Sequence, residues 1–201
     1  LVSILGVVIA PNNYDSLVYH LPRVAQWAQA GSIDHFPTWC ARQLYSNPFA
    51  ELVILHTYVL TGGDRLANAV QGAAFVGAVV AVTSVARRTG LGWLGQGWSA
   101  LFVATLPGAV VQGQTTQNDL VVGALLLTAG VFGFDVARGR TGAVQLVGWG
   151  GALGLACLTK GSALLLAPFV VIAPAVALGL KTGRRAALPL AFAGFLALAP
   201  N

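Results

Sequence analysis

Long apolar runs fill most of the chain after residue 65, and short polar connections separate them. Each run is apolar on all sides and close to the length of about 20 residues that a helix needs to cross a hydrocarbon core of about 30 Å. The runs occupy residues 66–86, 92–108, 120–136, 143–158, 162–180 and 186–201. This pattern predicts an all-α fold, a polytopic transmembrane helical bundle.

The chain before residue 66 follows a different pattern. Its opening apolar run, residues 1–10, is too short to cross a membrane, and we expect it to be the second half of a first span in a longer polypeptide. Residues 11–65 then form a long polar loop. We therefore predict a single module over 1–201, with this first loop at 11–65 and transmembrane helices at 66–201.

The first loop is expected to be ordered and to contain short interfacial helices. It is rich in aromatic side chains, which are typical of the membrane interface. Segment 49–61 is short for a span, so we interpret it as an interfacial or re-entrant helix. Pro22 predicts a helix break near Leu21, with a second helix starting at Pro22, because a proline inside a helix removes a hydrogen bond. The aromatic residues of the loop are Tyr14, Tyr19, Trp27, Phe36, Trp39, Tyr45 and Phe49.

Basic residues occupy alternate connections between the predicted spans, so these connections all lie on one side of the membrane. By the positive-inside rule that side is the cytoplasm. The first loop and residue 119 then face outside, and with them every acidic residue except Asp135. We therefore predict an integral protein of the bacterial inner membrane, with its active site outside the cytoplasm. The basic residues of these connections are Arg87, Arg88, Arg138, Arg140, Lys181, Arg184 and Arg185.

Composition agrees with a membrane protein. Hydrophobic residues make up 56% of the chain and charged residues only 8%, against about a quarter charged in soluble domains. The net charge of +5 is spread between apolar runs, so we expect no nucleic acid partner. Cys40 and Cys157 fit neither a disulfide framework nor a metal-binding spacing.

Asp15 is the first candidate for chemistry. It follows the first apolar run and precedes Tyr19, His20 and Arg23. A carboxylate at the membrane surface could deprotonate an incoming hydroxyl or amine. The alternative is a helix cap or a surface salt bridge.

A second group lies later in the first loop and contains His35, Arg42, Gln43, Asn47 and Glu51. Histidine and glutamate here could bind a divalent metal ion, which is the one cofactor that we consider. A hydrogen-bonded pair is the alternative for these residues.

The remaining candidates lie between spans. Gln114, Gln117, Asn118 and Asp119 form a polar stretch, and the charge of Asp119 favours the start of a helix. Lys160 lies between two apolar runs on the side opposite the arginines. A lysine at membrane depth is costly, which favours a functional role beside an anionic group such as a lipid phosphate. A snorkelling lysine at a helix end is the alternative.

Five segments together resemble the amino-terminal half of the GT-C superfamily, over nearly the whole chain. This superfamily comprises multispanning glycosyltransferases that use polyprenyl-phosphate sugars, such as protein O-mannosyltransferases and the aminoarabinose transferases of lipid A. The segments are N-N-Y-D-S-L-V-Y-H-L-P-R-V-A-Q-W, H-F-P-T, N-P-F-A-E, T-Q-N-D and G-L-A-C-L-T-K-G-S-A-L-L-L-A-P.

The resemblance implies roles for individual residues. Asp15 would be the catalytic base, supplied by the first extracytoplasmic loop. Asp119 would bind donor or acceptor or help with a metal ion, and Lys160 would lie near the phosphate of the lipid carrier. Glu51 falls where some relatives place a further acidic residue. The chain has a single aspartate after the first span, whereas several relatives have a paired acidic motif.

The implied reaction is a single displacement with inversion at the sugar. An acceptor hydroxyl or amine on a lipid, glycan or protein would attack the anomeric carbon, while Lys160 and Arg23 or Arg42 stabilise the departing phosphate. Two other classes stay open, namely a polytopic transporter or flippase and a noncatalytic membrane subunit. Transporters usually show internal repeats and interrupted helices near mid-membrane, whereas here the polar residues gather toward one surface.

Overall fold

The computed structural model of the protein describes residues 10–182 and 187–198. All regular structure within these ranges is helical, with ten α-helices, so the all-α prediction is confirmed. The predicted half-span at 1–10 lies outside the described residues except for its last position. The elements are η1 (Ser16–His20, a π-helical turn), α2 (Leu21–Ala30), α3 (Arg42–Tyr45), α4 (Phe49–Thr61), α5 (Ala67–Arg88), α6 (Trp93–Ala104), α7 (Pro107–Gln112), α8 (Asp119–Ala137), α9 (Ala143–Thr159), α10 (Ala163–Thr182) and α11 (Ala187–Leu198).

Three helices are long and apolar enough to cross a membrane: Ala67–Arg88, Asp119–Ala137 and Ala163–Lys181. These are α5, α8 and most of α10, and each coincides closely with a predicted span. Helix α9 is apolar but shorter, with 17 residues. The part of the chain that the structure describes therefore has the character of a membrane protein.

One predicted span is wrong as a single helix. The apolar run at 92–108 is divided between α6, which ends at Ala104, and α7, which begins at Pro107. A residue before proline is driven out of the helical region by the proline ring, and Leu106 has extended backbone angles of φ −61° and ψ 116°. Hydropathy alone did not locate this break.

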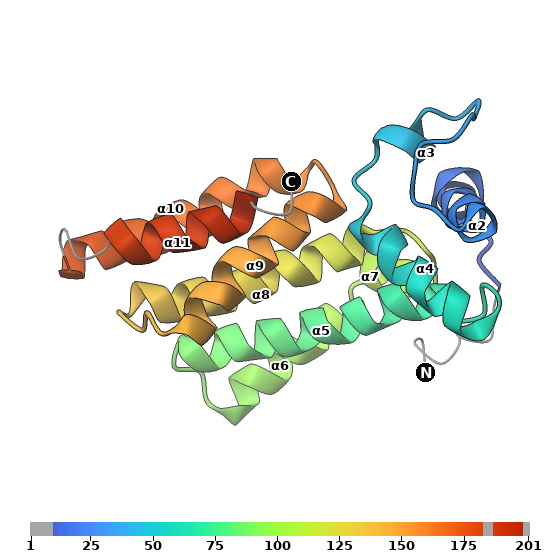
Figure 1. The fold of residues 1–201 in the computed structure, drawn as a ribbon. Helices are drawn as coiled ribbons and strands as arrows, with labels where there is room; N and C mark the ends of the chain where they lie inside the picture. Colours follow the sequence, from blue (N-terminus) through green and yellow to red (C-terminus); the bar gives the residue numbers. More distant parts are fainter. Residues whose placement is uncertain (1–9, 183–186, 199–201) are drawn as a thin grey trace.

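The long helices pack side by side around α8 (Figure 1). Helix α8 contacts α5, α9 and α10, while α11 packs on α9 and α6 on α5. The core between α8 and α9 contains Leu126, Ala129, Trp149 and Ala156, all buried. Close packing of this pair depends on glycine, because a Cβ at position 148 would lie 2.6 Å from the ring of Phe132.

The basic connections share one end of the bundle. The guanidinium of Arg88, the last residue of α5, lies 2.8 Å from Asp135 near the end of α8, and Arg140 lies 3.3 Å from the same carboxylate. Asp135 is the one acidic residue predicted on the basic side, and these two ion pairs account for it. The first loop packs at the opposite end (Figure 1).

Helices of the first loop form a compact cap at that opposite end. Helix α2 packs against η1 and α4, and α4 packs against α5 and α9. At 1.5 Å per residue, the 13 residues of α4 measure about 20 Å, which is less than the membrane core of about 30 Å. The helix is too short to cross by itself, as its sequence indicates.

The prediction near Leu21 is right in part: a second helix, α2, begins at Leu21 with Pro22 in its first turn, but the backbone stays helical where a break was predicted. Leu21 has helical angles of φ −70° and ψ −39°, and its backbone N–H donates to the carbonyl of Ser16 across a π-helical turn. Proline at 22 leaves the Val18 carbonyl without its usual i+4 donor. The side-chain amide of Gln43 donates to that carbonyl at 2.7 Å. The helix therefore continues through Pro22 instead of ending before it.

Candidate functional site

Asp15 lies at the start of η1, where three separate segments of the chain meet. The side-chain amide of Gln117 donates to one carboxylate oxygen at 3.2 Å. The other oxygen lies 3.8 Å from the guanidinium of Arg42, and the Asp15 side chain is 33% exposed. The carboxylate thus has one amide donor, one nearby cation and an open face.

Asp119 and Lys160 form an ion pair on the same side of the bundle. Asp119 is the first residue of α8 and Lys160 directly follows α9. The ammonium nitrogen lies 2.5 Å from a carboxylate oxygen, and both side chains are a little over one third exposed. Next to them, Asn118 donates its side-chain amide to the Thr159 carbonyl at 3.2 Å. These contacts join the beginning of α8 to the end of α9.

The segment before α8 connects Asp15 with this ion pair. The backbone N–H of Thr116 donates to the hydroxyl of buried Ser16 at 3.1 Å, and Gln117 binds Asp15. Asp119 follows two residues later. Residues 116–119 therefore connect the three candidates: Gln117 binds Asp15, and Asp119 binds Lys160.

Tyr19 is a member of this site that sequence reasoning did not select. Burial, followed by the negative charges of Asp15, Asp119 and Glu51, raises the pKa of Tyr19 to about 12, and Arg42 opposes this rise. The guanidinium of Arg42 also lies 5.6 Å from the centre of the Tyr19 ring. The sequence feature that could have indicated Tyr19 is its position four residues, or about one helical turn, after Asp15.

Glu51 and Arg23 lie inside the cap formed by the first loop. Glu51 is fully buried, and its carboxylate is 2.6 Å from Nδ1 of His20. Glu51 pairs with His20, whereas the sequence analysis grouped it with His35, which is exposed. Arg23 is buried, stacks 4.4 Å from the Trp27 ring and donates to the Ser46 carbonyl at 2.6 Å. Burial lowers the pKa of Arg23, and Glu51 acts in the opposite direction.

A hollow of about 630 Å³ opens beside Gln117. The residues that line it include Asn12, Asn13, Gln112, Gln114 and Gln117, together with apolar surface. Amide groups both donate and accept hydrogen bonds. The hollow therefore has groups that could bind a ligand with several hydroxyl groups, and Gln117 connects it to the carboxylate of Asp15.

Metal-binding groups do not gather around this site. Within residues 10–182 and 187–198, no three histidine, cysteine or acidic side chains lie close enough to hold a metal ion together. Asp119, which the resemblance connects with a metal, is bonded to Lys160 instead. The described side chains thus do not fit a metal held by protein ligands alone.

Comparison of the chain with family models, with curated proteins and with solved structures gave no match.

Proposed function

We propose that the protein is an integral membrane glycosyltransferase that moves a sugar from a polyprenyl-phosphate carrier to an acceptor hydroxyl or amine outside the cytoplasm. The observation that carries the proposal is the setting of Asp15. Its carboxylate is partly open and has Gln117 and Arg42 as partners, and Gln117 also lines a neighbouring hollow. The resemblance of the surrounding sequence to the GT-C superfamily supports the same reaction.

Asp15 acts as the general base. Its open carboxylate takes the proton of the acceptor hydroxyl or amine as that group attacks the anomeric carbon. A bond forms between the acceptor atom and the anomeric carbon, and the bond between that carbon and the phosphate oxygen breaks. The electron pair of the broken bond remains on the phosphate, and the proton remains on Asp15. A single displacement of this kind inverts the anomeric carbon.

Lys160 and Arg42 stabilise the departing phosphate. A lysine ammonium has three N–H donors, and Asp119 accepts from it through one oxygen at 2.5 Å. The other donors remain for a phosphate, while Asp119 positions the side chain. Arg42 is 56% exposed, so its guanidinium is accessible to a charged ligand. Both cations would act where negative charge develops, which is where electrostatic stabilisation speeds a reaction most.

Transfer from labelled polyprenyl-phosphate sugars tests the proposal, with the full-length protein in membranes. The expected result is breakage of the bond between sugar and phosphate, with label appearing on the acceptor. A transporter or flippase would move the labelled lipid across the bilayer and leave that bond intact. Intact lipid with every sugar tested, given inserted protein, would contradict the proposal.

A further inference from the structure

Arg23 is a buried cation with incomplete bonding. The residue is 6% exposed, and its Nε has no hydrogen-bond partner. Among the described residues no carboxylate lies within ion-pair distance of Arg23. The carboxylate of Glu51 is bonded to His20. A buried charge without an ion partner is costly, so a ligand anion would improve the bonding of Arg23.

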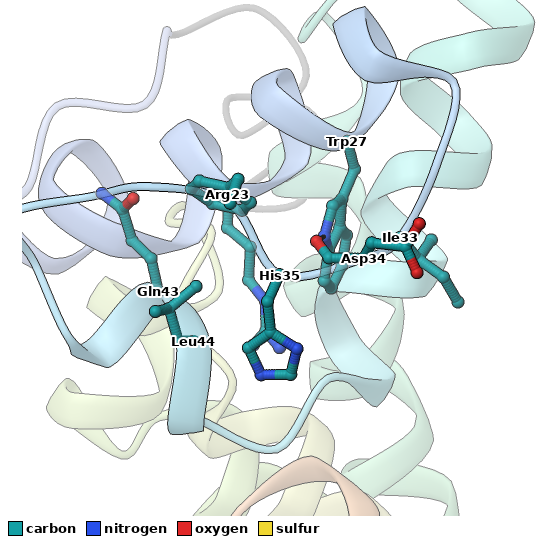
Figure 2. A pocket seen from close by; sticks show the side chains of 8 residues that line it. Arg23, Trp27, Ile33, Asp34, His35, Gln43 and Leu44 are labelled. Carbon is teal, nitrogen blue, oxygen red and sulfur yellow. Dashed lines mark hydrogen bonds between the residues drawn. The ribbon is translucent and has the colours of Figure 1, made fainter.

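A hollow of about 400 Å³ gives a ligand access to this arginine. The residues that line it include Arg23 and His35, which carry hydrogen-bond donors, and the apolar Leu44, Leu52 and Leu158. Figure 2 shows the adjoining small pocket, which shares Arg23, Trp27, His35 and Leu44, and there the arginine side chain extends toward the imidazole ring. Cationic and apolar groups therefore face the same space.

The one carboxylate beside the smaller pocket has another partner. Asp34 is exposed and accepts a hydrogen bond from the hydroxyl of Ser32. Its backbone carbonyl also accepts from the Trp27 indole at 3.3 Å. Asp34 thus helps to shape the wall and leaves Arg23 without an ion pair.

We propose that this hollow binds the phosphate group of an anionic amphiphile. The Arg23 guanidinium and the His35 ring donate to phosphate oxygens, since charge-assisted hydrogen bonds of this kind are short and strong. The leucine walls contact the adjoining hydrocarbon. Neither Lys160 nor Asp15 lines this hollow, so the site is separate from the one proposed for transfer and does not depend on that function.

Native mass spectrometry of the full-length protein, released from an uncharged detergent, measures this binding. Phosphatidic acid and inorganic phosphate are titrated in separate experiments. The expected result is saturable binding of phosphatidic acid, weakened about tenfold by Arg23→Gln because a hydrogen bond to a charged group is lost. Arg65→Gln is the matched control, because Arg65 is exposed and does not line the hollow.

His35→Ala separates loss of binding from loss of fold, because the His35 side chain is exposed. This variant should fold normally and bind phosphatidic acid several-fold more weakly. Inorganic phosphate that binds alone with the same dependence on Arg23 would identify free phosphate as the source of the anion. Equal binding by Arg23→Gln, His35→Ala and Arg65→Gln, or binding of neither probe, would overturn the proposal. Because no turnover is measured, this outcome is independent of the transfer reaction.

Discussion

Two acidic residues with similar exposure differ in their bonding. Asp15 accepts one hydrogen bond from an amide and lies 3.8 Å from Arg42. Asp119 is bonded at 2.5 Å to Lys160. A carboxylate that acts as a general base needs an oxygen that is not already bonded to a cation. This difference favours Asp15 as the base and Asp119 as the residue that orients Lys160.

The phenol of Tyr19 reports the charge of this site. Its pKa is raised to about 12, first by burial and then by Asp15, so it should ionise at a higher pH than an ordinary phenol. A phenol with a raised pKa in the folded state retains its proton longer than in the unfolded chain. Stability should therefore fall as pH rises from about 10 toward 12.

Absorbance titration of the wild type against Tyr19→Phe isolates this phenol. Asp15→Asn should lower the pKa of Tyr19, because one nearby negative charge is removed. The same Tyr19 titration in Asp15→Asn and wild type would mean that Asp15 does not act on this ring.

The residues of the site could be selected from the sequence, but most of their partners could not. Asp15, Asp119 and Lys160 were conspicuous as polar groups beside apolar runs. The contact between Lys160 and Asp119 spans 41 positions, and that between His20 and Glu51 spans 31. Such pairs depend on how helices pack, which the local pattern does not specify. The sequence analysis accordingly grouped Glu51 with His35 and left Tyr19 out.

At the scale of elements, proline in α10 creates a bond between helices. Pro174 has no backbone N–H, so the Val170 carbonyl lacks its usual donor. The indole N–H of Trp149 on α9 donates to that carbonyl at 3.3 Å. In both places a proline leaves a backbone carbonyl without a donor, and a side chain from another element donates to it. Trp149 does so for Val170, and Gln43 does so for Val18.

Trp149→Phe should destabilise the protein by about 1–3 kcal/mol, because the partly buried Val170 carbonyl loses its donor. The unfolding midpoint in detergent measures this, with exposed Trp98→Phe as the control. In a Pro174→Ala background residue 174 supplies the N–H itself, so the cost of Trp149→Phe should shrink. An equal cost in both backgrounds would mean that only packing is lost.

Gly148 sets the distance between α8 and α9. Gly148→Ala places a methyl group 2.6 Å from the Phe132 ring, so the ring or the helices must shift. We expect a loss of about 1–3 kcal/mol, as is usual for an overpacked core. Gly151→Ala on the same helix is the control, because a Cβ there meets no atom within 4 Å. Equal unfolding midpoints for the two variants would contradict this packing.

Helix positions follow from the sequence because apolar length is a strong local signal. The predicted runs 66–86 and 120–136 became Ala67–Arg88 and Asp119–Ala137. The errors lie where backbone geometry outweighs hydropathy, at the α6–α7 break before Pro107 and at the π-helical turn before Pro22. Proline marked both places, but its effect differed with the contacts around it.

At the scale of the whole molecule, the arginine-rich connections after α5 and α8 lie at the end of the bundle opposite the candidate site. Arg88 and Arg140 bind Asp135 at one end, and the cap formed by the first loop lies at the other (Figure 1). Asp15 belongs to this cap, because it directly precedes η1, which packs against α2. The positive-inside rule then predicts that the cap faces outside the cytoplasm.

Labelling with a membrane-impermeant thiol reagent tests this orientation. A cysteine introduced by Asp64→Cys should react in intact cells, whereas one introduced by Arg140→Cys should react only after lysis. Both positions are exposed, and the native Cys40 and Cys157 are buried. The reverse pattern would place the candidate site in the cytoplasm.

The most direct test of the central claim is the initial rate of sugar release from the polyprenyl phosphate by Asp15→Asn, relative to wild type. Asp64→Asn is the matched control, because Asp64 is an exposed acid of the same first loop. Loss of a general base costs about 10²- to 10⁴-fold, so Asp15→Asn should slow release by at least about 100-fold while Asp64→Asn does not. Equal rates for Asp15→Asn and wild type, with both inserted normally, would contradict the assignment of Asp15 as the base.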